Sequence, residues 1–283
     1  MIKLSAFSDE ASSSLKGQIA ALKRNGISYT ELRSIDGVNV KDFSIAYAKE
    51  SKKELLDNGI DVWAIGSPLG KVDINVDFSE YSKTVKHVLE LANVFGTDKI
   101  RMFSFFNAYN EPNKVFDYLS KMVEIAKNYG VSLCHENEKE VFGDIAERVK
   151  LLMDNVDALK FVYDPANYVQ VGEKAQTTLD LFHKKTEYFH IKDVIKETEE
   201  LVPAGYGDGN ILELINRIEK DTVLTLEPHL AVFEGYASID NTVMKNKFEF
   251  KSNDEAFDFA VVSLKSLLEK AGYKEFKEGF IKK

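Results

Sequence analysis

Four polar residues in the second half of the chain are of types that bind metal ions, and each lies at the end of a short apolar segment. They are Glu136, Asp164, His190 and Glu227. Three carboxylates held close together need a counter-charge to stay ionised, and a divalent cation would supply it. Oxygen ligands with one imidazole favour Mn²⁺, with Mg²⁺, Co²⁺ or Zn²⁺ as alternatives. We therefore interpret the four residues as ligands of one divalent metal ion, whose open positions would take substrate oxygens.

A single acidic residue at the end of an apolar segment is more often a helix cap or a solvated loop residue than a ligand. These four, however, follow four consecutive segments in order, and no structural requirement repeats in that way. The choice is least direct after segment 131–134, where His135, Glu136 and Glu138 compete. Side chains alternate along a strand, so Glu136 and Glu138 share one face. We choose Glu136 because it lies at the strand end.

Such ligands need a scaffold, and the chain repeats one unit that provides it. A short apolar segment rich in β-branched residues is followed by polar residues and then by apolar residues at helical spacing. Four helical patterns end in a glycine just before the next segment, at Gly26, Gly59, Gly96 and Gly130, where glycine can adopt the left-handed conformation that ends a helix. The eight predicted strands are 2–7, 27–32, 60–65, 99–105, 131–134, 159–163, 188–191 and 222–226.

Strands that alternate with helices are joined by crossover connections and form a parallel sheet. Eight such units in 283 residues predict a (β/α)₈ TIM barrel that forms a single domain over residues 1–283. An open doubly wound sheet is the alternative, but it usually has fewer strands. A barrel places catalytic groups at the C-terminal ends of its strands. Neighbouring strands lie about 4.8 Å apart, so the four ligands can converge on one ion.

The chain resembles the sugar phosphate isomerase/epimerase superfamily, the xylose-isomerase-like barrels, over nearly its whole length. This superfamily includes ketose 3-epimerases, inosose isomerases, dehydratases and the endonuclease IV branch. The resemblance rests on the motifs Ser5-Ala6-Phe7-Ser8-Asp9-Glu10, Tyr29-Thr30-Glu31-Leu32-Arg33, His135-Glu136-Asn137-Glu138, Asp164-Pro165-Ala166-Asn167, His190-Ile191-Lys192-Asp193 and Leu226-Glu227-Pro228-His229-Leu230. It implies the same metal ligands and assigns the roles of acid and base to Glu136 and Glu227.

The ligand set suggests proton transfer on a sugar or sugar phosphate. A metal ion that polarises a carbonyl group acidifies the neighbouring carbon, and a glutamate can remove that proton to give an enediolate. A second glutamate can return a proton to the same carbon or to its neighbour, which gives epimerisation or isomerisation. Loss of a hydroxyl group instead would make the protein a dehydratase of a cyclitol or keto-sugar. A non-catalytic sugar-binding relative is the remaining alternative.

Several further residues are candidates for contact with a carbohydrate substrate. Two of them differ from the epimerase pattern: Asn167 replaces a histidine that often follows the metal aspartate, and Lys196 replaces an arginine that often follows the metal histidine. Both can still hydrogen-bond to hydroxyl groups, although the planar two-point contact of an arginine is lost. The other candidates lie near strand ends and are Lys192, His229, Arg33, Arg101 and Lys71.

Two loops have compositions that suggest a role. The glycine-rich turn 205–209 precedes a helical pattern; such turns can bind phosphate, and a flexible loop is the alternative interpretation. Segment 228–253 is long for a loop and carries several aromatic residues. We interpret it either as a lid over the site or as a contact surface in a homo-oligomer.

Composition excludes several classes of function. A net charge of −9 argues against a nucleic-acid-binding surface. The five histidines are too few for the multi-metal cluster of the endonuclease branch. No apolar segment reaches the roughly 18 to 20 residues of a membrane span, and the apolar N-terminus is too short for a signal peptide. The one cysteine, Cys134, fits a reducing compartment, so we expect a cytoplasmic protein without a membrane partner.

Overall fold

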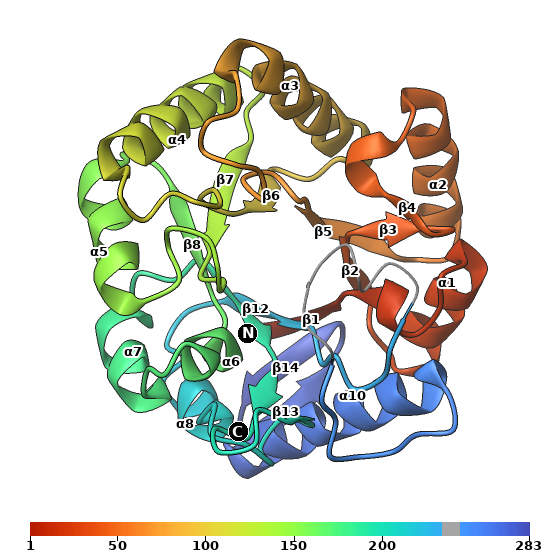
Figure 1. The fold of residues 1–283 in the computed structure, drawn as a ribbon. Helices are drawn as coiled ribbons and strands as arrows, with labels where there is room; N and C mark the ends of the chain where they lie inside the picture. Colours follow the sequence, from red (N-terminus) through yellow and green to blue (C-terminus); the bar gives the residue numbers. More distant parts are fainter. Residues whose placement is uncertain (234–243) are drawn as a thin grey trace.

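The computed structural model describes residues 1–233 and 244–283 and confirms the predicted α/β barrel (Figure 1). Parallel strands form the barrel wall, and helices surround it on the outside. The strands are β1 (Ile2–Ala6), β2 (Tyr29–Leu32), β5 (Asp61–Gly66), β6 (Lys99–Met102), β7 (Ser132–Glu136), β8 (Lys160–Tyr163), β9 (Tyr188–Ile191) and β12 (Thr222–Leu226). Each is hydrogen-bonded to the next around the barrel from β2 to β12 and on to β1. Between β1 and β2 the hydroxyl of Thr30 donates to the carbonyl of Ala6 over 3.1 Å.

Amphipathic helices connect the strands and bury one face each against the barrel wall. Along α3, for example, the buried side chains recur at the spacing of one helical face, from Tyr81 through Val85 to Ala92. The helices are α1 (Leu15–Arg24), α2 (Ile45–Asp57), α3 (Phe78–Phe95), α4 (Pro112–Lys127), α5 (Ala146–Asn155), α6 (Pro165–Gln170), α7 (Ala175–Phe182), α8 (Ile211–Asn216) and α10 (Asn253–Lys270). No helix in 1–233 or 244–283 is both long and apolar enough to cross a membrane.

The glycines between helices and strands behave as the sequence predicts. Gly26, Gly59, Gly96 and Gly130 have φ angles of 66°, 75°, 82° and 68°, which lie in the left-handed region. Gly96 is itself the C-cap of α3, and its amide donates to the carbonyl of Ala92. Each glycine therefore ends a helix and turns the chain back toward the next strand.

The fourth predicted strand is too long. Segment 99–105 was expected to be extended throughout, but β6 ends at Met102. Beyond it the chain pairs with the loop after β5: the amide of Phe103 donates to Leu69 and that of Phe105 to Gly70, over 2.7 and 2.8 Å. The buried residues Phe103 and Phe105 thus belong to a loop that follows β6, which an apolar sequence pattern alone does not distinguish from a strand.

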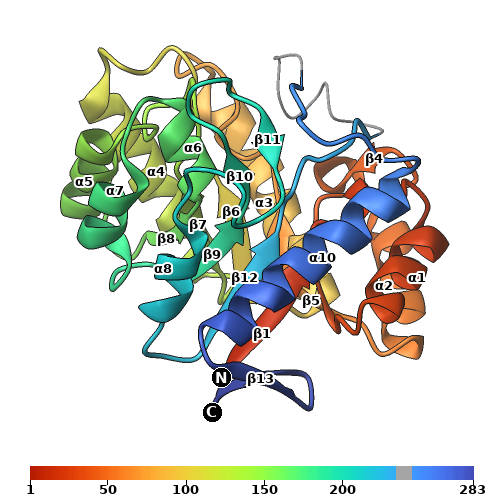
Figure 2. The same ribbon diagram turned by 90° about the horizontal axis from the view of Figure 1, so that it is seen from below.

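Within the described residues, three small hairpins add to the barrel. Short strands β3 (Ser34–Ile35) and β4 (Val38–Asn39) form one, and β10 (Asp193–Val194) and β11 (Leu201–Val202) form another, both close to the C-terminal ends of the barrel strands. The third was not expected from the sequence: β13 (Tyr273–Phe276) and β14 (Gly279–Lys282) extend the sheet beyond β1. Figure 2 shows it beside the N-terminus, at the opposite end of the barrel from β11.

The segment interpreted as a lid or oligomer contact, 228–253, is described only in part, because residues 234–243 lie outside the described residues. Its first residues contact residues that follow β1 and β2: the amide of His229 donates to Glu10 Oε2 over 2.8 Å, and the guanidinium of Arg33 lies over the ring of Phe233.

Candidate metal centre

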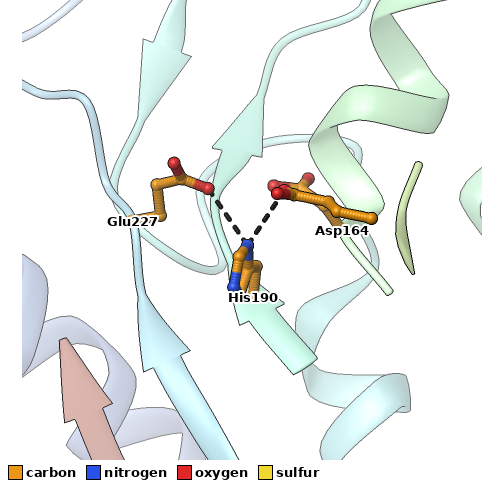
Figure 3. Close-up of side chains that lie close together, drawn as sticks. Asp164, His190 and Glu227 are labelled. Atoms are coloured by element: carbon orange, nitrogen blue, oxygen red, sulfur yellow. Dashed lines mark hydrogen bonds and ion pairs between the residues drawn. The ribbon is translucent and has the colours of Figure 1, made fainter. Parts of the chain in front are cut away.

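The four predicted ligands come from four neighbouring strands and point to one place. Glu136 is the last residue of β7, His190 lies within β9, and Asp164 and Glu227 directly follow β8 and β12. Each is at most 3% exposed. Figure 3 shows the side chains of Asp164, His190 and Glu227 turned toward one another. We call Glu136, Asp164, His190 and Glu227 the quartet.

Distances within the quartet suit a single ion. One ligand atom from each residue lies within 4.8 Å of all the others. His190 Nδ1 is 2.9 Å from Glu136 Oε1 and 3.2 Å from Glu227 Oε2. Metal–ligand bonds of about 2.1 Å place ligand atoms roughly 3 to 4 Å apart, so small side-chain movements would complete the coordination.

Two quartet oxygens lack the hydrogen bonds that buried carboxylates normally make. Asp164 Oδ2 and Glu227 Oε2 are buried and accept none. The other oxygen of Asp164, Oδ1, accepts from the backbone amide of Asn167 over 2.9 Å and caps α6. Glu227 Oε2 lies 3.2 Å from His190 Nδ1, and Asp164 Oδ2 lies 3.1 Å from Lys192 Nζ. Buried carboxylate oxygens that accept no hydrogen bond are available to bind a cation, so the residues fit a divalent ion.

Lys192 is a buried cation in contact with two members of the quartet. Its Nζ lies 3.1 Å from Asp164 Oδ2 and 3.9 Å from Glu227 Oε2.

The pKa values of three quartet residues are shifted by burial and by their neighbours. Burial raises the pKa of Asp164 to about 7. For Glu227, burial would raise the pKa, but Lys192 and His190 hold it well below its usual value. His190 itself would have a lowered pKa from burial, yet Glu136 and Glu31 raise it well above 6.5. Charges in the centre are thus strongly coupled.

Both predicted arginines contact a quartet glutamate. Arg33 forms a two-point ion pair with Asp9, with N–O distances of 2.9 Å, and its Nη1 lies 3.1 Å from Glu227 Oε1. Arg101 Nε lies 3.1 Å from Glu136 Oε2, and its Nη1 donates to the carbonyl of Ser67 over 2.9 Å. Each arginine therefore holds the outer oxygen of one glutamate and limits where that carboxylate can point.

Asn167 and His229 also lie beside the quartet. Asn167 Nδ2 is 3.4 Å from Glu136 Oε1 and donates to the carbonyl of Asn137 over 2.9 Å. His229 Nε2 is 3.6 Å from Glu227 Oε1 and 3.3 Å from Glu10 Oε1.

A second group of possible ligands overlaps the quartet. One ligand atom each from Glu10, Glu227 and His229 lies within 4.8 Å of the other two. The guanidinium of Arg33 already lies within 3.3 Å of both glutamates, so a cationic side chain provides the counter-charge there.

Lys71 and Lys196 lie farther out. Lys71 is 3.1 Å from Glu138 Oε2 and packs over the ring of Phe103. Lys196 is exposed and directs its ammonium group to the carbonyl of Gly172 over 3.4 Å. The structure therefore places Lys71 at the rim of the barrel mouth and Lys196 outside the buried centre.

The glycine-rich turn surrounds an internal carboxylate. The amides of Gly205, Gly207 and Gly209 donate to Asp193 over 2.8, 3.1 and 2.8 Å. The turn thus holds a carboxylate of the same chain in the way that such turns hold phosphate groups. A phosphate bound to these amides would have to displace Asp193.

Sequence reasoning did not identify three buried carboxylates as part of the centre: Asp9, Glu10 and Glu31. Asp9 and Glu10 follow β1 in a 3-10 turn, η1 (Ser8–Glu10), and burial raises the pKa of Glu10 to about 8. Glu31 lies within β2, between Thr30 and Leu32. A charged residue inside a predicted strand was the available signal, because a buried charge needs a partner.

Comparisons with known proteins agree with this architecture. A sequence model described as xylose isomerase-like TIM barrel matches residues 19–241. No curated protein sequence matches the chain.

Solved structures share the fold at low sequence identity. The probable 3-DHS dehydratase AsbF of Bacillus anthracis is 17% identical, with 94% of this chain and 98% of that chain covered and a TM-score of 0.72. For the IOLI protein with a bound zinc atom, the identity is 17%, the coverage 95% and 99%, and the TM-score 0.71. A D-psicose 3-epimerase studied with D-fructose is 15% identical, with coverage of 95% and 99% and a TM-score of 0.72.

At these identities the structural likeness establishes the fold, and the sequence match establishes the relationship. The matched residues begin in α1 and continue past β12, the last strand of the barrel wall. They include all four members of the quartet. The chain therefore belongs to the xylose isomerase-like TIM barrel family.

Proposed function

We propose that the protein is a divalent-metal-dependent isomerase or epimerase that moves a proton on the carbon next to a carbonyl group of a small carbohydrate. The observation that carries this proposal is the position of two glutamates on either side of one histidine nitrogen. Glu136 and Glu227 lie 2.9 and 3.2 Å from His190 Nδ1 and come from β7 and β12, with β8 and β9 between them.

The proposed reaction uses these two carboxylates as base and acid. When bound, the cation would polarise the carbonyl group and make the neighbouring carbon acidic. One glutamate then removes the proton from that carbon, and the other returns a proton from the other side. Return to the same carbon inverts its configuration, whereas return to the former carbonyl carbon moves the carbonyl group along the chain. Arg33 and Arg101 keep the two carboxylates apart and in place. Mn²⁺ remains our preferred ion.

A dehydratase of a cyclitol or keto-sugar is a second candidate, and the position of Lys192 favours it. The departure of a hydroxyl group needs a proton, and the Lys192 ammonium lies 3.1 Å from Asp164 inside the centre. The same glutamates would remove the proton from the neighbouring carbon. Both candidates share the ligands, the base and the class of substrate, and they differ in the product.

Seven side chains are proposed to contact the substrate or its anionic groups. Five of them lie within 3.6 Å of a quartet atom, and the last two lie farther out: Lys192, Arg33, Arg101, Asn167, His229, Lys71 and Lys196. The side chains next to the quartet are buried and are suited to hydrogen-bond to the hydroxyl groups of a sugar. Lys71 at the rim is suited to the far end of a longer or phosphorylated sugar.

Segment 228–253 remains proposed as a lid or as an oligomer contact. Near its beginning, His229 packs against Phe233 with ring centroids 5.7 Å apart, and His229 Nε2 lies 3.6 Å from Glu227 Oε1, which supports the lid. Near its end, Phe248 and Phe250 join Tyr206 and Phe259 in an aromatic cluster with centroids 5.5 to 6.5 Å apart. Tyr206 is 56% exposed, which leaves part of this cluster open to a second copy of the chain.

Incubation with a panel of ketoses, inososes and their phosphates in D₂O tests the proposed reaction. Deuterium uptake at one carbon, followed by NMR and mass spectrometry, identifies the substrate and the type of reaction together. We expect Glu227→Gln to lose activity by roughly 10²-fold or more while it keeps the circular dichroism of the wild type. Glu187→Gln is the matched control, because Glu187 precedes β9 at the opposite end of the barrel. Wild-type turnover by Glu227→Gln would contradict the proposal.

A further inference from the structure

Glu31 is a buried carboxylate that the proposed reaction does not use. It lies in β2, across the barrel from β7, β8 and β9, and is 1% exposed. A charge at that depth is strongly destabilising unless polar groups compensate for it. Its side chain must therefore be held by specific partners, and two of them come from β9.

Glu31 contacts the proposed ligand His190 at Nε2, the ring nitrogen that faces away from Glu136 and Glu227. Oε2 lies 3.1 Å from His190 Nε2, and Oε1 accepts a hydrogen bond from the hydroxyl of Tyr188 over 2.9 Å. Arg101 Nε lies 3.8 Å from Oε1. The ring of His190 is also held edge-on between Phe7 and Tyr188, with centroid distances of 5.2 and 5.6 Å. Both the plane and the outer nitrogen of the imidazole are thus fixed.

The two ring nitrogens of His190 face different surroundings. Nδ1 faces Glu136 and Glu227, whereas Nε2 faces Glu31. A carboxylate can only accept a hydrogen bond, so the contact with Glu31 requires a proton on Nε2. The carboxylates at Nδ1 likewise favour a proton there, and a bound cation would take the place of that proton. A metal ligand must offer a lone pair, and in a neutral imidazole the nitrogen without the proton is the one that has it.

We propose that Glu31 is a positioning residue that keeps the proton of His190 on Nε2 and leaves Nδ1 to bind the cation. This inference rests on the proposed function, since it takes His190 Nδ1 as a metal ligand. Partners of this kind orient a ligating histidine and raise its basicity. Tyr188 and Arg101 complete the arrangement, because the Tyr188 hydroxyl donates to the other oxygen of Glu31 and the Arg101 guanidinium forms an ion pair with it.

The variant Glu31→Gln separates charge from shape. A glutamine side chain has the same size but carries one oxygen and one amino group. Arg101 can only donate, so the glutamine oxygen is favoured on the side of Tyr188 and Arg101. The amino group then faces His190 Nε2 and needs a lone pair there. The proton moves to Nδ1, where it opposes binding of the cation.

Zn²⁺ is the probe for this inference because it is diamagnetic and allows NMR of the imidazole nitrogens. The Kd for Zn²⁺ is measured by competition with a chelator for the wild type, Glu31→Gln and Asp193→Asn. Asp193 is a matched control: it is 1% exposed and bound by glycine amides rather than by the quartet. We expect Glu31→Gln to weaken Zn²⁺ binding roughly 10- to 100-fold. Asp193→Asn should lower the melting temperature without a change in Kd.

The ring ¹⁵N signals of His190 give a readout that general destabilisation would not reproduce. In the Zn²⁺-loaded wild type we expect the metal on Nδ1 and a proton on Nε2. Zinc on Nε2 would overturn the inference, whether or not Glu31→Gln folds. So would Zn²⁺ binding by Glu31→Gln that is as tight as in the wild type, with the Nε2 proton retained. A wild type that binds no Zn²⁺ or Mn²⁺ at this centre would instead overturn the proposed function, and the inference with it.

Discussion

Asp164 uses its two oxygens for different purposes. Oδ1 caps α6 by accepting the amide of Asn167, and Pro165 occupies the first turn of that helix. Oδ2 accepts no hydrogen bond and faces the Lys192 ammonium group at 3.1 Å inside the centre. A residue that ends a strand and also begins a helix is held rigidly, so the cap fixes the direction of the proposed metal ligand.

Substitutions at Asp164 should separate these two roles. Asparagine caps a helix about as well as aspartate, whereas replacement by alanine costs about 1 kcal/mol. We therefore expect Asp164→Asn to retain more stability to urea than Asp164→Ala when both proteins are free of metal. Both variants should bind Mn²⁺ much more weakly than the wild type, as measured by calorimetry. Binding by Asp164→Asn at the wild-type affinity would show that the aspartate is only a cap.

At the scale of single residues, the sequence predicted the quartet but not its surroundings. The quartet could be predicted because each member lies at the end of an apolar segment, and a barrel brings such ends together. Glu31 contacts His190, 159 positions away in the chain, so local spacing could not pair them. Likewise Arg33 was a candidate for contact with the substrate, and its pairing with Asp9 depends on how β1 and β2 lie in three dimensions.

The turn between β11 and α8 shows how an element can be stabilised by one side chain. Asp193 accepts from three glycine amides of segment 205–209 and from the amide of Val194. A Cβ atom added to Gly207 would lie 2.5 Å from Asp193 Oδ1 and 2.6 Å from the carbonyl of Val194. No side chain fits there unless the turn moves.

We therefore expect Gly207→Ala to lower the free energy of unfolding by roughly 1 to 3 kcal/mol, because the added methyl group overpacks the turn. Denaturation by urea measures the change. Gly172→Ala is a useful comparison, since a Cβ atom at Gly172 meets no atom within 4 Å and any loss there comes from its positive φ of 89° alone. A Gly207→Ala variant as stable as the wild type would contradict the tight packing around Asp193.

The sequence predicted the barrel elements better than the connections between them. Apolar strands and glycine-terminated helices repeat with a regular pattern that is visible without tertiary information. The loop 103–105 was assigned to a strand because its buried phenylalanines look the same in both settings. The turn 205–209 has a composition that suits a bound anion, and only the fold shows that Asp193 is that anion.

At the scale of the whole molecule, the C-terminal hairpin joins the end of the chain to its beginning. Phe280 of β14 pairs with Ile2 of β1, and both side chains are buried. The hairpin was not predicted because β13 is mostly exposed and alternates too briefly to give a clear strand pattern. It lies at the end of the barrel opposite to the site.

Loss of the Phe280 ring should therefore destabilise the barrel without affecting the centre. We expect Phe280→Ala to lower the free energy of unfolding by about 3 to 5 kcal/mol, as for other buried phenylalanines. Phe276→Ala is the control, because Phe276 lies in the same hairpin and is 47% exposed. Both variants should bind Mn²⁺ as the wild type does. Weaker metal binding by Phe280→Ala alone would indicate that the two ends of the barrel are coupled.

Metal binding should also stabilise the whole molecule, because the quartet joins four strands and exists only in the folded state. A saturating ion at about 100 times its Kd adds about 2.7 kcal/mol to the free energy of unfolding. We expect the melting temperature to rise with Mn²⁺ and to fall again when EDTA is added. A melting temperature that does not respond to either would contradict a metal site in the native protein.

Calorimetric titration of the chelator-treated protein with Mn²⁺ tests the central claim most directly. The account predicts one ion bound per wild-type chain, and loss of that binding in the folded double variant Glu136→Gln/Glu227→Gln. It is contradicted if the wild type binds no divalent ion, or if the double variant binds one with the same affinity.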